Sequence, residues 1–173
     1  MKTKQILDIM KIVSWIIFIG LCIKAGALII SFFVSLLVNP EAASNLYLGL
    51  NLSEIYNSNK TYYIITVLYI ISIAALKAYL FYWVIKIFLK INLEQPFSLA
   101  VGRLINTISY IALSIGLTNL FANAYAEWLV NKGINYRLTF ESSEFLFLAG
   151  ILFVIGLLFK RGIEMQQENE LTI

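Results

Sequence analysis

Histidine is absent from this chain, and Cys22 is its only cysteine. These absences exclude disulfides within the chain, zinc sites built from cysteine and histidine, and every catalytic triad that needs an imidazole. The sequence also has no Walker loop, no glycine-rich dinucleotide turn and no zincin helix. We therefore expect a protein that is not an enzyme and that binds neither a metal ion nor a cofactor.

Charge is scarce as well. Charged residues make up 13% of the 173 residues, whereas 60% are hydrophobic, and soluble domains carry about 25% charged residues. A soluble fold of this size could not hide that much apolar surface, so lipid must be its solvent. The length allows one domain. The net charge of +3 is spread beside apolar runs rather than gathered in a patch for nucleic acid, so we expect no direct nucleic-acid binding.

Four long apolar runs fill most of the chain. They cover about residues 12–38, 62–88, 104–125 and 145–160, and a spanning helix needs about 20 residues. The fourth run is short by itself and is extended by its flanks. The sequence therefore predicts an all-α membrane protein with four transmembrane helices arranged as two hairpins. A hinge at residues 89–103 joins the hairpins, and a tail at 161–173 follows the last span.

Two stretches outside the spans alternate apolar and polar residues. The apolar positions are Leu46, Leu48, Leu50 and Leu52 in the first loop, and Ile134, Tyr136, Leu138 and Phe140 in the third. A period of two indicates a strand. Both loops lie on one side of a four-span protein, so we predict that they pair into a small β element that caps the helices. The alternative is two irregular loops with coincidental alternation.

Lysine and arginine are divided unequally between the two sides. Eight lie in the N-terminal segment, the hinge and the tail: Lys2, Lys4, Lys11, Lys86, Lys90, Arg103, Lys160 and Arg161. Three lie in the first and third loops: Lys60, Lys132 and Arg137. Because cytoplasmic loops carry an excess of these residues, we predict that both termini and the hinge are cytoplasmic and that the two larger loops are outside.

Two lysines remain inside the apolar runs. Lys24 lies about midway along the first run and Lys77 in the inner half of the second. An ionised lysine at the centre of a spanning helix costs about 2.5–3.5 kcal/mol, and such residues usually face the bundle interior or a wet cavity. The alternative is that each lysine snorkels along its alkyl stem toward the nearer interface.

The third run offers a matching polar face. Small and polar residues follow at spacings of three and four: Asn106, Ser109, Ala112, Gly116, Asn119, Asn123 and Glu127. One interpretation is that this helix is the packing centre of the bundle. The other is a polar cavity lined by Lys24, Lys77, Asn119 and Asn123. Because we expect no carboxylate at that depth, two unpaired cations would favour an anionic guest such as a lipid head group.

Two segments carry a resemblance to a known family. The tail from Phe159 to Ile173, with its Glu168-Asn169-Glu170-Leu171-Thr172-Ile173 end, resembles the C-terminal signature of the DUF2975 family, with Glu170 where an aspartate is usual. The hinge sequence Gln95-Pro96-Phe97-Ser98 followed by Arg103-Leu104 is similar to the family's Asn-Pro-Phe pattern, with Gln95 replacing the asparagine. The resemblance implies a multi-pass protein of the bacterial cytoplasmic membrane, of unknown function, often encoded beside small helix-turn-helix regulators.

Two functions follow as hypotheses. The first is a regulatory or sensory membrane protein that acts on a cytoplasmic protein partner through the hinge and tail. Its candidate partner-binding residues are Pro96, Phe97, Arg103, Arg161, Glu164 and Glu168. The alternative is a binder or transporter of a small anionic or amphipathic molecule, or a lipid, through the cavity at Lys24 and Lys77. The small-residue faces also leave a homo-oligomer open.

Overall fold

The computed structural model describes residues 3–92, 97–134 and 138–170, and the side chains of the last part up to residue 168. In chain order the elements are α1 (Thr3–Leu37), the 3-10 helix η1 (Pro40–Ser44), α2 (Ser53–Ser58), α3 (Lys60–Lys90), α4 (Leu99–Asn131) and α5 (Ser142–Glu170). The helices α1, α3, α4 and α5 are long and apolar enough to cross a membrane. The four predicted spans fall on these four helices.

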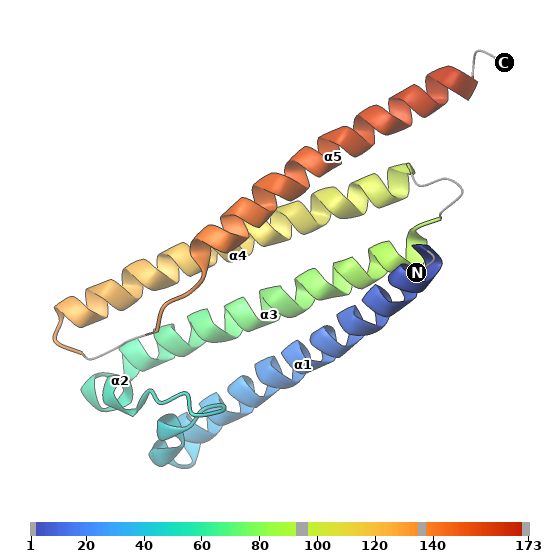
Figure 1. Cartoon of the computed structure of the whole chain (residues 1–173). Coiled ribbons are helices and arrows are strands. Elements are labelled where there is room, and N and C mark those ends of the chain that lie inside the picture. The colour runs from blue at the N-terminus through green and yellow to red at the C-terminus, as the bar shows by residue number, and fades with distance from the viewer. Residues whose placement is uncertain (1–2, 93–96, 135–137, 171–173) are drawn as a thin grey trace.

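The long helices form an open row. α1 packs on α3, α3 on α4, and α4 on α5, so the predicted hairpins are present and are joined through α3 and α4 (Figure 1). Only 11% of the most apolar stretch of α1 and of α5 is buried inside the protein, against 50% for α4. α4 is therefore the packing centre, as the first interpretation of its small and polar face predicted.

The two ends of the row differ. We call one the hinge end: it holds the start of α1, the connection after α3 and the last turns of α5 (Figure 1). We call the other the capped end, and it holds η1, α2 and the described residues between α4 and α5. α3 and α4 begin with side-chain caps, since the Asn59 Oδ1 accepts from the Thr61 N–H at 2.7 Å and the Ser98 Oγ accepts from the Val101 N–H at 3.3 Å.

Among the described residues there is no strand, so the predicted β element is not found in them. The first loop forms η1, a tight turn at residues 46–50 and α2. In the turn Leu48 has φ 47° and Gly49 has φ 85°, which twists the chain back within two residues. The alternating stretch of the third loop includes residues 135–137, which lie outside the described residues.

The two loops nevertheless meet over one apolar cluster. Leu46 and Leu52 of the first loop and Ile134 of the third are buried in it together with Tyr63 of α3. The predicted position of the two loops, together over one end of the helices, is therefore confirmed, whereas the predicted β pairing is not found in the described residues. The alternating leucines do not share one buried face, since Leu46 and Leu52 are buried whereas Leu48 is 87% exposed.

α5 lies against α4 through small residues. A Cβ built on Gly116 of α4 would lie 2.7 Å from the Leu146 Cδ2 and 3.0 Å from the Leu146 backbone N, so the two backbones approach closely. The Ser109 hydroxyl donates to the Ala149 carbonyl at 2.9 Å. Because Gly116 is near the middle of α4, α5 begins beside the middle of α4 rather than at its end (Figure 1).

Candidate functional site

A cavity of about 390 Å³ lies between α1, α3 and α4 at the capped end. Its described lining is Leu21, Lys24, Leu28, Tyr47, Leu48, Leu50, Ile70, Ile73, Ala74, Lys77, Asn119, Leu138, Thr139, Phe140 and Glu141. Three of the four residues predicted for a polar cavity, Lys24, Lys77 and Asn119, are thus brought together from three helices. Asn123 is not part of this lining.

The chain between α4 and α5 enters the row of helices. Asn119 lies about 18 Å from the end of α4, at a rise of about 1.5 Å per residue, yet its Nδ2 donates to the Glu141 carbonyl at 2.9 Å. The segment 138–141 therefore runs back along about a third of the length of α4 in a non-helical conformation. Non-helical backbone at such depth in a membrane needs partners from protein or water.

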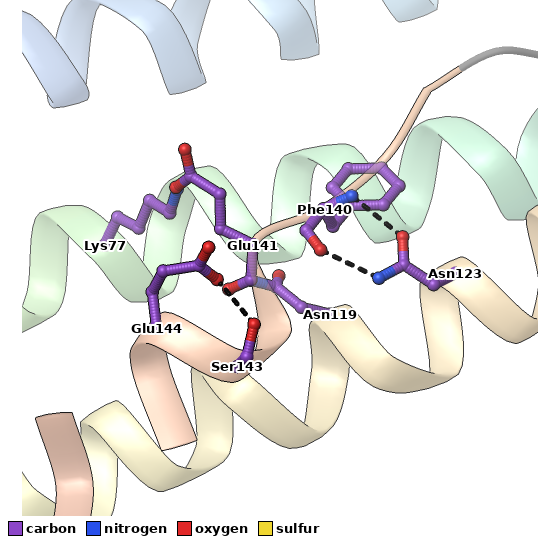
Figure 2. Close-up of polar contacts among 7 residues, drawn as sticks. All are labelled: Lys77, Asn119, Asn123, Phe140, Glu141, Ser143 and Glu144. Carbon is purple, nitrogen blue, oxygen red and sulfur yellow. Dashed lines mark hydrogen bonds and ion pairs between the residues drawn. The ribbon is translucent and has the colours of Figure 1, made fainter. Parts of the chain in front are cut away.

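Asn123 supplies two of those partners. Its Nδ2 donates to the Phe140 carbonyl at 2.8 Å, and its Oδ1 accepts from the Phe140 N–H at 2.8 Å, as Figure 2 shows. Both hydrogen-bonding groups of this side chain are used by backbone. Asn123 therefore positions the wall of the cavity. Its own side chain lies outside the described lining of this cavity and lines a neighbouring pocket with Leu138 and Thr139.

Lys77 faces a carboxylate. Its Nζ lies 3.6 Å from the Glu141 Oε2 (Figure 2). The same Nζ lies 4.9 Å from the centre of the Phe145 ring. The expectation that no carboxylate lies at the depth of the lysines was wrong, because the segment 138–141 carries Glu141 inward. At 3.6 Å the pair is too long for a hydrogen bond, so the ammonium keeps donors for another partner.

Lys24 has no ion pair among the residues that the structure describes. It lies on an exposed position of α1 and lines the cavity from that side. Lys24, Lys77 and Glu141 are the charged residues of the described lining, which gives the cavity a formal charge of +1. Among the described residues, there is no group of three or more histidine, cysteine, aspartate or glutamate side chains that could hold a metal ion.

Sequence reasoning missed Glu141 and the segment that carries it. One signal was present: the apolar run that begins near Phe145 has only about 15 residues, fewer than the roughly 20 that a bilayer requires. A run this short leaves room for the connection before it to enter the membrane, although the helix itself, α5, is long enough to cross.

The candidate partner-binding residues lie at the hinge end. The Phe97 ring lies 5.2 Å from the Phe159 ring, between centroids, and covers Gly162. Arg161 donates to Glu164 at 3.1 Å, and this pair is exposed. The structure therefore joins the hinge to the start of the tail, which is a helical continuation of α5. Arg103 and Glu168 are exposed on α4 and α5, and Pro96 lies outside the described residues.

The fold and the cavity define a small multi-pass helical membrane protein with a polar site between its helices. A family model described as "Protein of unknown function (DUF2975)" matches residues 47–173. The chain belongs to the DUF2975 family. No curated protein and no solved structure matches the chain.

Proposed function

We propose that this protein binds a small anionic amphipathic molecule in the cavity at the capped end. The observation that carries the proposal is the convergence of Lys24, Lys77 and Asn119 from three helices on one cavity. Its volume of about 390 Å³ falls in the range of about 300–1,000 Å³ typical of ligand pockets. The formal charge of +1 favours an anion, and leucine and isoleucine side chains on the remaining walls favour an apolar portion.

The distribution of lysine and arginine supports the placement of this cavity. We propose that the hinge end faces the cytoplasm of a bacterial cell and the capped end faces outward, because eight of these residues flank the spans at the hinge end and three at the capped end. The cavity then opens toward the outer half of the cytoplasmic membrane.

Native mass spectrometry of the protein released from membranes tests the proposal. The wild type should retain a bound amphiphile, and the Lys24→Met, Lys77→Met double variant should retain at least about tenfold less, because hydrogen bonds to charged groups contribute about 1.5–3 kcal/mol each. The control is the Lys4→Met, Lys90→Met variant, which removes two exposed charges at the hinge end. Equal retention by all three proteins would overturn the proposal.

We propose a second function at the hinge end: contact with a cytoplasmic protein partner, through which the membrane protein acts as a regulator or sensor. The specific observation in its favour is the packing of Phe97 on Phe159 and Gly162. It joins the described part of the hinge to the start of the tail, the two segments in which the family resemblance lies. Phe97 remains 43% exposed, so part of its ring is free to contact a partner.

A pull-down from cross-linked membranes tests this second function. The informative variant ends at Glu164, because Gly162 and Ile163 pack against Phe97 and Gly102 and must be kept for the fold. The wild type should recover one partner that the truncated protein loses, and an Arg103→Glu variant should recover less of it. Recovery of the same proteins by the truncated chain would reject a role for the tail.

A further inference from the structure

Asn119 carries an acceptor that none of the described residues pairs with. Its side chain is 1% exposed, and its Nδ2 donates to the Glu141 carbonyl. Because only the amide nitrogen can donate, this bond fixes the orientation of the amide and turns the Oδ1 away from Glu141. The Oδ1 is buried and has no hydrogen bond among the described residues. Buried acceptors are rarely left unpaired, and Asn119 lines the cavity.

The lining of the cavity therefore matches a ligand that carries both an anionic group and a hydrogen-bond donor. An anion is favoured beside Lys24 and Lys77, since the first has no ion pair among the described residues and the second holds Glu141 only at 3.6 Å. A hydrogen-bond donor is favoured at the Asn119 Oδ1, which is fully covered in the unliganded structure and has to be uncovered when a ligand enters. A bare carboxylate or a phosphodiester with a methyl cap offers the first and not the second. A hydroxyl close to the anionic group offers both.

The volume limits how much of a lipid enters. A volume of about 390 Å³ corresponds to about a dozen water molecules at about 30 Å³ each. That space takes a polar head and the first carbons of a chain, and the remainder of the chains stays in the bilayer. Leu21, Leu28 and Ile70 supply apolar wall next to the lysines for those first carbons.

We infer that the cavity recognises a phosphate ester with a hydroxyl beside the phosphate, of the phosphoglycerol class, carried by a lipid. The phosphate lies by Lys24 and Lys77, displacing Glu141, and the hydroxyl donates to the Asn119 Oδ1. This inference rests on the proposed binding of an anionic amphiphile and adds the identity of its head.

The test uses the wild-type protein in vesicles that mix three lipids with identical chains: phosphatidylglycerol, phosphatidylmethanol and phosphatidylcholine. Phosphatidylmethanol has the same anion without the hydroxyls. Native mass spectrometry should show phosphatidylglycerol retained about fivefold over phosphatidylmethanol, as one neutral hydrogen bond provides, and both retained over phosphatidylcholine. In the Asn119→Leu variant the two anionic lipids should become equal. Since the wild-type comparison needs no variant, a misfolded variant leaves the test intact.

A fourth arm separates a lipid from a soluble ligand. Free glycerol phosphate, added at the same concentration, should fail to displace phosphatidylglycerol; displacement would support the head chemistry and assign a soluble ligand. Equal retention of phosphatidylglycerol and phosphatidylmethanol by the wild type would overturn the inference. If that retention still depended on Lys24 and Lys77, the proposed function would stand alone, and if it did not, both would fail.

Discussion

The side chains of Asn119 and Asn123 hold the segment 138–141 by hydrogen bonds to its backbone. Three hydrogen bonds of 2.8–2.9 Å join the two amides to the backbone of Phe140 and Glu141. Without them, polar backbone groups would lie unpaired beside apolar helices, which costs about 1–3 kcal/mol for each group. The two asparagines therefore hold a wall of the cavity.

The Asn123→Leu variant should lose about 2–4 kcal/mol of stability, because it leaves the N–H and the carbonyl of Phe140 without their partner. Thermal unfolding in detergent, followed by circular dichroism, measures the change as a lower melting temperature. The matched control is Asn57→Ala on the exposed surface of α2, which should leave the melting temperature unchanged. Equal melting temperatures for both variants would show that the amide does not hold the segment.

If the cavity binds an anion as proposed, Glu141 competes with that anion for Lys77. The pair is long and the Glu141 side chain is 67% exposed, so the pair contributes little by itself. Glu141→Gln should therefore raise retention of an anionic amphiphile severalfold, because the cavity gains a formal positive charge while its shape is kept. Native mass spectrometry measures the retention, and Glu144→Gln, which lies outside the cavity lining, is the control. Lower retention in Glu141→Gln would contradict this role.

At the level of elements, the contact between α4 and α5 depends on glycine. Gly116→Ala would place a methyl group 3.0 Å from the Leu146 backbone N, so α5 must move. Overpacking of this kind costs about 1–3 kcal/mol, and the melting temperature in detergent should fall. Gly150→Ala on α5 meets nothing within 4 Å and should be neutral or stabilising, since alanine favours helix over glycine by about 1 kcal/mol. A similar loss in both variants would mean that the close approach is absent.

The sequence predicts the long helices well because length and apolar composition decide them locally. The convergence of Lys24, Lys77 and Asn119 was also predictable, since each is a costly polar residue inside an apolar run. The path of residues 138–141 was not predictable, because the spacing of residues in the sequence does not determine how far a loop folds back along a helix. That missing step hid Glu141.

At the scale of the whole molecule, both ends of the described chain lie at the hinge end (Figure 1), and we predict that this end is cytoplasmic. In a Cys22→Ser background, Asn57→Cys at the capped end should react with an impermeant maleimide in intact cells. Gln167→Cys near the end of α5 should react only after the membrane is opened. Both positions are exposed. The opposite labelling pattern would reverse the orientation and place the cavity in the cytoplasmic half.

Because the helices form an open row, the α1 side of the cavity is held less firmly than the α3 and α4 sides. α1 contacts α3 but neither α4 nor α5 among the described residues, so Lys24 reaches the cavity from a helix that is held on one side only. A ligand that bridges Lys24 and Asn119 would connect α1 to α4. We therefore expect bound amphiphile to raise the melting temperature of the wild type, and to have little effect on the Lys24→Met, Lys77→Met variant.

The most direct measurement is a crystal structure of the wild-type protein grown from a lipidic mesophase doped with phosphatidylglycerol. We predict density for a head group between Lys24, Lys77 and Asn119, with a hydroxyl within hydrogen-bond distance of the Asn119 Oδ1. A cavity that contains only water, or that is closed by the side chains of α1 and α3, would contradict the proposed binding of an amphiphile.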